Sequence, residues 1–243
     1  MTSKTLPDKP CLLRTEGLRK HFDGAKVING IDMQIRTGEV RCVIGPNGAG
    51  KSTFFKLLTG EHMPTSGDVT FMGRRLGRML PHERIRLGMG IKFQIPGVFA
   101  ELTVWEHLSL TRSLRRQATI EESEQQLEVF QLRHERDTLA ANLSHGKKQW
   151  LEIAMAVSLK PTLLMLDEPV AGLSNEETHL TGELIKGLQA GGQTVMVVEH
   201  DMTFVRQIAT QVTVLHGGRV FADGDADEVL ARSDVADIYL GNM

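Results

Sequence analysis

A glycine-rich run near the start of the chain carries a lysine and two hydroxyl side chains. It reads Gly45-Pro46-Asn47-Gly48-Ala49-Gly50-Lys51-Ser52-Thr53 and matches the P-loop pattern in full. Glycines let backbone N–H groups curl around phosphate oxygens, Lys51 adds positive charge toward the β and γ phosphates, and the Ser52 hydroxyl can reach a magnesium ion. The run predicts a nucleotide site. The alternative is a glycine-rich turn with a chance lysine.

Two carboxylates follow an apolar run further along the chain. The segment reads Leu163-Leu164-Met165-Leu166-Asp167-Glu168-Pro169. Asp167 is expected to hold magnesium, usually through water, and Glu168 to polarise the water that attacks the γ-phosphate. Taken alone, the pair could be a solvated acidic turn after a core strand. Beside the P-loop it predicts hydrolysis of the triphosphate.

Strand ends must bring these groups together. The apolar run Val40–Ile44 leads into the glycine-rich loop, and a helix is expected over residues 52–59. Residues 162–166 and 194–198 are apolar throughout, which is typical of parallel strands covered on both faces. A helical stretch at roughly 175–189 lies between them.

Shorter apolar alternations predict further strands. Residues 12–19, 27–36 and 68–73 have the pattern of half-buried antiparallel strands. Residues 212–216 and 220–222, joined by Gly217-Gly218, predict a hairpin before a last helix.

The middle of the chain changes to a helical period, from residue 103 to 159. Two helix starts carry the Thr-x-x-Glu capping box, Thr103 with Glu106 and Thr119 with Glu122. A third helix is expected to begin near Ser144 and to stop before Pro161. This stretch predicts a helical subdomain.

Composition and charge limit the kinds of partner that the chain is expected to bind. The chain has 243 residues and a net charge of -2, with interspersed charges, so it lacks the basic excess typical of nucleic-acid binding. Cys11 and Cys42 suggest neither a disulfide framework nor a metal site. The first residues contain no apolar signal segment, and no apolar run approaches the roughly 20 residues of a membrane span. We expect a cytoplasmic protein that reaches a membrane only through a partner.

With both phosphate motifs in order, the chain resembles the ATP-binding cassette family from about Leu12 to Leu240. The resemblance implies an ATPase that uses ATP and Mg²⁺. Gln94 resembles the Q-loop glutamine, which touches magnesium and the attacking water and senses the membrane partner. His200 resembles the switch histidine that contacts the γ-phosphate. Phe22 matches the aromatic residue that stacks on adenine, although a core phenylalanine is the alternative.

The segment Leu143-Ser144-His145-Gly146-Lys147-Lys148-Gln149 resembles the family signature, usually written LSGGQ. His145 replaces the first glycine and Lys147 the glutamine, so only Ser144 and Gly146 are carried over. A hydroxyl and a backbone amide at a helix N-terminus form an anion site. Without the family, Ser144 is simply an N-cap.

In the family, this helix end caps the ATP bound by a second subunit. The resemblance therefore implies a head-to-tail dimer of two identical chains or of close paralogues. Ala171-Gly172-Leu173-Ser174 occupies the position of the D-loop, which links the two sites, but ends in serine instead of aspartate.

Together these features predict one α/β cassette over residues 1–243: a P-loop NTPase core with a mixed or parallel sheet, an N-terminal antiparallel β subdomain and an inserted helical subdomain. Residues 12–93 and 161–243 form the core, and 95–160 the helical part. The expected catalytic residues are Lys51, Gln94, Glu168 and His200; those binding nucleotide are Phe22, residues 45–53, Ser144 and Gly146; those holding metal are Ser52, Gln94 and Asp167.

Finer details resemble the ATPases of importers for branched-chain amino acids and urea. They are segments 93–96, 98–99 and 102–104, the helix start 149–153 and the ending 238–241. The Ser144-His145-Gly146 variant is most similar to the urea importer subunit. The resemblance implies membrane permeases, indirect work with a periplasmic binding protein, a place at the cytoplasmic face of the inner membrane, and an apolar docking groove near residues 95–110 that includes Val98 and Phe99.

Three alternatives remain open. A lipopolysaccharide-export ATPase has the same general length and ending. A soluble cassette ATPase could act on ribosomes or chromosomes, although such proteins usually carry two cassettes or long coiled coils. Nucleotide could also act only as a structural switch, without hydrolysis.

Overall fold

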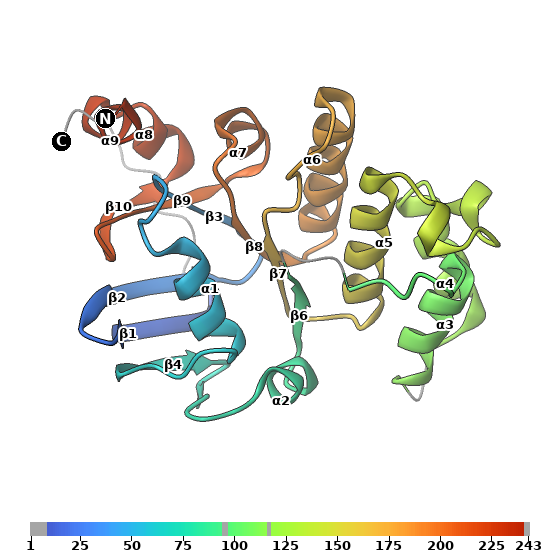
Figure 1. Ribbon diagram of the computed structural model, residues 1–243, viewed down its shortest axis with the longest axis horizontal. Helices are drawn as coiled ribbons and strands as arrows, with labels where there is room; N and C mark the ends of the chain where they lie inside the picture. The colour runs from blue at the N-terminus through green and yellow to red at the C-terminus, as the bar shows by residue number, and fades with distance from the viewer. Residues whose placement is uncertain (1–8, 94–96, 116–117, 241–243) are drawn as a thin grey trace.

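The computed structural model describes residues 9–93, 97–115 and 118–240. Two sheets and their helices make up one side of the molecule in Figure 1, and a lobe of helices α3 to α5 extends from the other. No helix within the described ranges is long and apolar enough to cross a bilayer.

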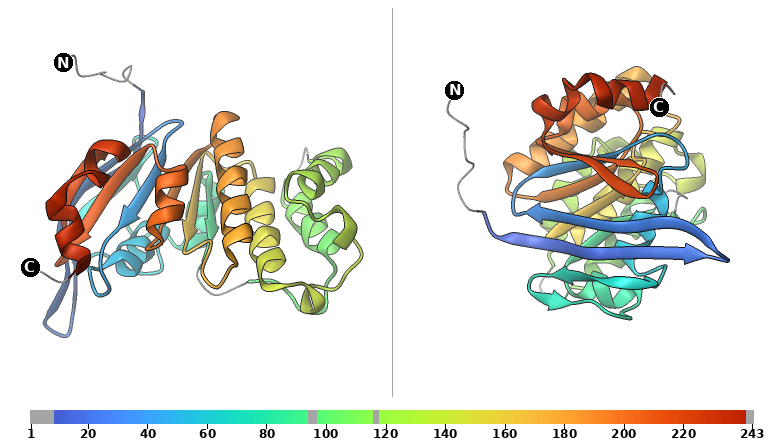
Figure 2. Two further views of the ribbon diagram at one scale, coloured as in Figure 1. Left: turned by 90° about the horizontal axis from the view of Figure 1, so that it is seen from above. Right: turned by 90° about the vertical axis from the view of Figure 1, so that its left-hand side faces the viewer.

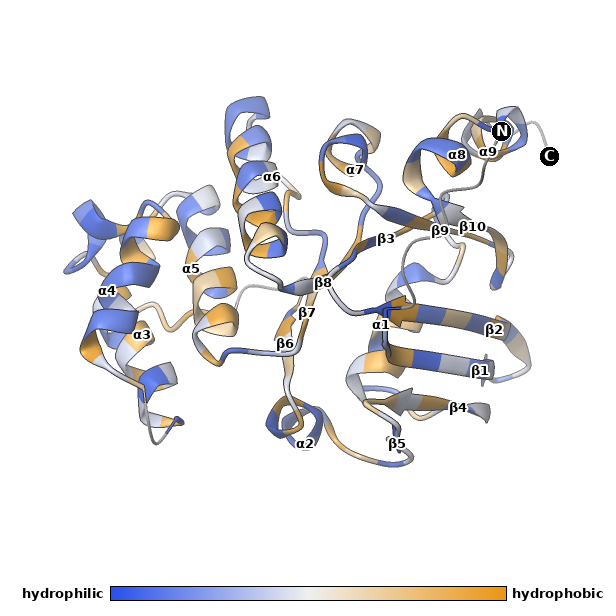
Figure 3. Ribbon diagram, turned by 180° about the vertical axis from the view of Figure 1, so that it is seen from behind, coloured by the Kyte–Doolittle hydropathy of each residue, from blue (hydrophilic) through white to orange (hydrophobic). Residues whose placement is uncertain are grey.

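The first sheet is antiparallel, as the alternating runs predicted. Its strands are β1 (Cys11–Phe22), β2 (Ala25–Arg36), β4 (Ser66–Phe71) and β5 (Arg74–Arg75), in the order β2-β1-β4-β5. Hydrophobic and hydrophilic residues alternate along β1 and β2 in Figure 3. Because side chains alternate between faces, one face packs into the core and the other meets solvent.

The second sheet positions the phosphate motifs. Its order is β10-β9-β3-β8-β7-β6. The members are β3 (Val40–Ile44), β6 (Met89–Lys92), β7 (Leu163–Asp167), β8 (Thr194–Val198), β9 (Gln211–His216) and β10 (Arg219–Asp225). All neighbours pair in parallel except β9 with β10. This mixed sheet confirms the predicted α/β class.

Hydrophobic clusters cover both faces of the second sheet. Successive residues of β7 alternate between them: Leu164 and Leu166 belong to one cluster, Leu163 and Met165 to the other. On β3, Cys42 faces the first cluster and Val43 the second. Burial on both sides explains why these strands are apolar throughout.

Helices flank this sheet. They are α1 (Lys51–Thr59), α2 (Pro81–Arg86), α6 (Asn175–Ala190), α7 (Met202–Ile208), α8 (Ala226–Leu230) and α9 (Ser233–Leu240). The single last helix that the sequence predicted is therefore two short ones. The sequence patterns did not predict α2, α7, β5 or β6. In the ending that resembles importer ATPases, Ile238 is buried and Tyr239 packs against the core.

The helical lobe contains α3 (Val104–Ser113), α4 (Ile120–Val129) and α5 (His145–Ser158). Two 3₁₀ turns, 133–135 and 140–142, connect α4 to α5. Figure 2 shows α5 running alongside α6, between the sheet and the rest of the lobe. Trp150 is buried and donates from its indole nitrogen to the Thr181 hydroxyl, at 2.9 Å. The boundary at residue 95 remains a prediction, since Ile95 lies outside the described residues.

One of the two predicted capping boxes is complete. The Thr103 hydroxyl accepts a hydrogen bond from the Glu106 backbone N–H. In return, the Glu106 carboxylate accepts one from the Thr103 backbone N–H, at 2.7 Å. At the second, Thr119 accepts from the Glu122 backbone, but the Glu122 carboxylate pairs with Arg115 and Lys160 instead. Two nearby cations compete with a backbone N–H for that carboxylate, so the reciprocal half of the prediction was wrong.

Arg84 fixes the far end of the helix that follows the P-loop. The residue is 1% exposed, and its guanidinium donates to the carbonyls of Leu57 and Leu58, at 2.8 and 2.7 Å. It also donates to Met79, at 3.0 Å. These carbonyls include the last of α1, which have no partner within the helix. Arg84 therefore ties α2 to α1.

Replacing Arg84 by Met should lower the free energy of unfolding by about 2–4 kcal/mol, because buried carbonyls lose their donors. Urea unfolding followed by circular dichroism measures the change. Arg86→Met is the matched control, since Arg86 is exposed on the same helix. Equal urea midpoints for the two variants would show that Arg84 does not anchor α1.

Candidate functional site

The carboxyl ends of three neighbouring strands meet at one edge of the second sheet. Val43 of β3 lies opposite Val198 of β8, and Val198 lies opposite Asp167 of β7. The chain leaves β3 into the P-loop, β7 into Glu168 and β8 into Glu199. The register of parallel strands thus brings together groups that are far apart in sequence, as expected at this edge of an open α/β sheet.

Close packing requires glycine at two positions of the P-loop. Gly45 has φ 152°, and a Cβ there would lie 2.2 Å from the Leu215 carbonyl oxygen. Gly50 has φ 100°, and its Cβ would lie 2.8 Å from the Ile28 side chain. Both positions favour a residue without a side chain. The loop is therefore pressed against β9 and β2 and ends at the N-terminus of α1.

Lys51 folds back over the loop. Its ammonium group donates to the carbonyls of Gly45 at 2.7 Å and Pro46 at 3.1 Å. Burial lowers its pKa, while the negative charges of Glu168 and Asp167 act in the opposite direction. The lysine charge therefore lies inside the loop, close to both predicted carboxylates, and α1 points its positive dipole end at the same place.

Asp167 carries a buried oxygen that has no hydrogen-bond partner among the described residues. The residue is 3% exposed, and its Oδ1 accepts no hydrogen bond from residues 9–93, 97–115 or 118–240. Burial, followed by the charge of Glu168, raises the pKa of Asp167 to about 6. A buried carboxylate oxygen without a donor is unfavourable, and a hard cation such as Mg²⁺ prefers oxygen ligands of this type. The donor set of Asp167 and the Ser52 hydroxyl therefore fits magnesium.

Glu168 is held in an unusual backbone conformation. Its φ is 46°, in the left-handed region, which costs an ordinary residue roughly 1–3 kcal/mol. Its backbone N–H donates to the Val198 carbonyl at 3.0 Å. The His200 ring nitrogen Nδ1 lies 3.9 Å from Glu168 Oε1. The structure thus brings Lys51, Asp167, Glu168 and His200 to one edge of the sheet.

Two charged residues at this edge were not assigned a role from sequence. Glu199 is fully buried, and its Oε2 accepts from the backbone N–H groups of His200 and Asp201, at 2.7 and 3.1 Å. Burial raises the pKa of Glu199. Lys92 is 2% exposed and donates to the Asp167 carbonyl at 3.3 Å. The sequence did contain a signal for both residues. Glu199 is a charge directly after an apolar strand, and Lys92 is a charge within one.

Two further predicted residues flank the edge. Phe22 is 37% exposed, which excludes the alternative of a core phenylalanine. Its ring meets His62 edge-on, with centroids 5.3 Å apart, and Lys20 Nζ lies 4.7 Å from its centroid. Gln94 lies outside the described residues.

The signature segment lies away from this sheet edge, at the start of α5. Ser144 caps α5, where its hydroxyl accepts from the Lys147 backbone at 3.3 Å, and the Lys147 side chain pairs with Glu135. Figure 1 places α5 in the helical lobe and α1 on the other side of β6 to β8. The structure therefore does not bring Ser144 and Gly146 to the P-loop of the same chain.

The helix start after the D-loop also has a local role. Ser174 forms a reciprocal capping box with Glu177: its hydroxyl accepts from the Glu177 backbone at 3.2 Å, and its N–H donates to that carboxylate at 3.0 Å. Serine at this position thus caps α6.

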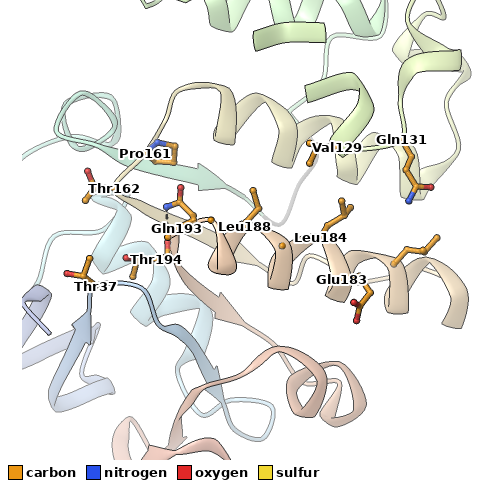
Figure 4. Close-up of a pocket in the computed structure, with 14 residues that line it drawn as sticks. Thr37, Val129, Gln131, Pro161, Thr162, Glu183, Leu184, Leu188, Gln193 and Thr194 are labelled. Atoms are coloured by element: carbon orange, nitrogen blue, oxygen red, sulfur yellow. Dashed lines mark hydrogen bonds between the residues drawn. The ribbon is translucent and has the colours of Figure 1, made fainter. Parts of the chain in front are cut away.

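A hollow of about 700 Å³ lies along α6 (Figure 4). Apolar side chains such as Leu184, Leu188 and Val129 line it, together with Thr162 and Thr194. Those threonines stand at the amino ends of β7 and β8. The hollow is therefore at the opposite edge of the sheet from the phosphate motifs.

Comparison with known proteins agrees with this geometry. The family model described as ABC transporter matches residues 28–171. A probable branched-chain amino acid transport ATP-binding protein, LivG of Archaeoglobus fulgidus, is 34% identical, with 95% of each chain covered. LivG of Salmonella typhimurium is also 34% identical, over 95% of this chain and 98% of its own. LptB of Acidithiobacillus ferridurans, from a lipopolysaccharide export system, is 31% identical over 96% and 98%.

Solved structures show the same fold. The ATP-binding cassette MJ1267 of an ABC transporter, in its ADP conformation, superposes with a TM-score of 0.86 at 29% identity and covers 96% of this chain and all of its own. The structure of cbiO1 from Clostridium perfringens, part of an ABC transporter complex, has a TM-score of 0.81 at 29% identity and covers 96% of both chains. Together with the sequence matches, this assigns the chain to the ATP-binding cassette family, as the ATP-binding, ATP-hydrolysing subunit of an ABC transporter.

Proposed function

We propose that the strand-end edge performs the hydrolysis with residues in distinct roles. Lys51 and the P-loop of residues 45–53, which offers the backbone N–H groups of its residues other than Pro46, bind the β and γ phosphates, and the exposed ring of Phe22 stacks on adenine. Glu168 orients and polarises the attacking water. His200 contacts the γ-phosphate, and Gln94 joins the water and the metal. The convergence of Lys51, Glu168 and His200 supports these assignments.

Magnesium would be held by the Ser52 hydroxyl, by Asp167 and by Gln94. The buried Oδ1 of Asp167, which has no donor in the described part of the chain, supports this proposal. When bound, the ion neutralises charge on the phosphate oxygens. The raised pKa of Asp167 is consistent with a carboxylate that needs a cation to be stable in its charged form.

A second cassette would complete each ATP site. Ser144 and the Gly146 backbone lie at the start of α5, away from the P-loop of their own chain. They would contact a γ-phosphate only if that phosphate is bound by a second cassette in a head-to-tail arrangement. The partner is a second copy of this chain or a close paralogue. Two ATP molecules would then lie between the subunits and hold them together.

We propose that the subunit drives an importer for a small polar solute, urea or a branched-chain amino acid. LivG proteins of branched-chain amino acid transport support the importer class. The Ser144-His145-Gly146 variant favours urea. The subunit would work at the cytoplasmic face of the inner membrane, bound to permeases and indirectly served by a periplasmic binding protein. Export of lipopolysaccharide is the second candidate, supported by the likeness to LptB.

The permeases would dock beside α3. Phe99 is 56% exposed, and its ring stacks on His107 with centroids 6.0 Å apart. Leu110 is also exposed. Val98, expected in the same patch, instead packs half-buried against the core. The proposed docking surface is therefore centred on Phe99.

Lys51→Ala should weaken ATP binding by about 10- to 100-fold, because a charged phosphate contact is lost. Titration with a fluorescent ATP analogue measures the affinity. Lys186→Ala, which removes an exposed lysine of α6, serves as the control. Unchanged affinity in Lys51→Ala would remove Lys51 from the phosphate site.

Glu168→Gln should reduce kcat by at least about 100-fold while ATP remains bound, since the amide keeps the shape but cannot act as a base. Phosphate release and size-exclusion chromatography with ATP follow turnover and the closed dimer. Glu176→Gln, an exposed change in α6, should have no effect. Near-normal turnover of Glu168→Gln would show that another residue orients the water.

The complex of this subunit with its permeases and binding protein, reconstituted in vesicles, should take up urea or leucine only with ATP on the cytoplasmic side. Competition between the two labelled solutes identifies the substrate. Uptake of neither, with lipopolysaccharide extracted instead, would contradict the importer assignment.

A further inference from the structure

The departure from the family signature places an imidazole against the D-loop. His145 is the first residue of α5, and its Nε2 lies 3.0 Å from the Ala171 carbonyl oxygen. A side chain at the next residue, Gly172, would begin only 3.4 Å from the same nitrogen. With Nε2 protonated, the ring donates to Ala171. A glycine at position 145 could not make this contact.

Ala171 is in turn connected to the proposed catalytic base. Its backbone N–H donates to the Glu168 carbonyl at 3.3 Å, which closes a turn directly after that residue. Glu168 is in the left-handed conformation, so its side-chain direction depends on the turn that holds it. Ala171 is therefore part of the turn that holds the Glu168 backbone in place.

A second contact holds the D-loop and the signature together. Gly146 lies so close to α6 that a Cβ there would be 2.3 Å from Glu177 Oε1. The Glu177 carboxylate accepts from the Ser174 backbone and hydroxyl, at 3.0 and 2.9 Å. The D-loop is thus contacted at its start by His145 and capped at its end by a residue that packs on Gly146.

We propose that His145 is a positioning residue that couples the two ATP sites of the dimer. Ser144, the adjacent residue, meets the ATP of the partner, while Ala171 holds Glu168 at the ATP of its own chain. The His145 hydrogen bond joins these two groups by one short path. A change at either ATP is then transmitted to the other, and the coupling is reciprocal in its free energy. This inference rests on the proposed dimer.

The test compares His145→Ala, which removes the donor, with His145→Gln, whose amide can still donate to Ala171. The readout is the Hill coefficient of ATP hydrolysis by the full-length dimer with its permeases. We expect a wild-type value approaching 2, the limit for two sites, a fall toward about 1 in His145→Ala, and recovery in His145→Gln. His134→Ala, an exposed histidine of the same lobe, should behave as wild type.

Melting temperatures separate coupling from folding, because His145 is exposed and its loss should leave stability nearly unchanged. A cooperative His145→Ala variant overturns the inference, as does equal loss of cooperativity in the Ala and Gln variants. If wild-type protein fails to dimerise with ATP in light scattering, the proposed function itself fails. If it dimerises and the Hill coefficient does not change when His145 is replaced, only the coupling role fails.

Discussion

The burial of like charges at one sheet edge is the constraint on which the rest of the structure depends. Asp167 is the last residue of β7 and Glu199 directly follows the neighbouring strand β8, and both residues are almost entirely removed from water. Such burial is costly unless cations and donors compensate for it. Lys51, Lys92 and the backbone N–H groups of the turn after β8 provide part of that compensation. An Mg²⁺–ATP complex would provide more.

This constraint explains why the edge is assembled from the ends of buried strands. Parallel strands covered on both faces fix the positions of Val43, Asp167 and Val198 relative to one another. Loops of such a scaffold can then hold strained conformations such as that of Glu168. The signature segment has a different basis. It is organised by α5 and its contacts with the D-loop and α6, which leaves Ser144 available to a second cassette.

The sequence predicted the α/β class and the groups at the sheet edge, because the apolar runs and the order of the motifs are local signals. It missed β6 because Gly90 and Lys92 interrupt the apolar pattern, and only the tertiary fold shows that Lys92 is buried beside Asp167. The capping box at Thr119 is incomplete because Arg115 and Lys160, separated from Glu122 along the chain but in contact with it in the fold, compete for its carboxylate. The contact between His145 and Ala171 joins residues that no periodicity relates.

The proposed dimer requires Ser144 of one copy to face the P-loop of another across ATP. Disulfide trapping tests this most directly, with Ser144→Cys and Asn47→Cys in a Glu168→Gln chain whose Cys11 and Cys42 are replaced by serine. Covalent dimers should form rapidly with ATP and Mg²⁺, and only slowly with ADP or without nucleotide. Trapping that is absent, or that does not depend on ATP, would contradict it.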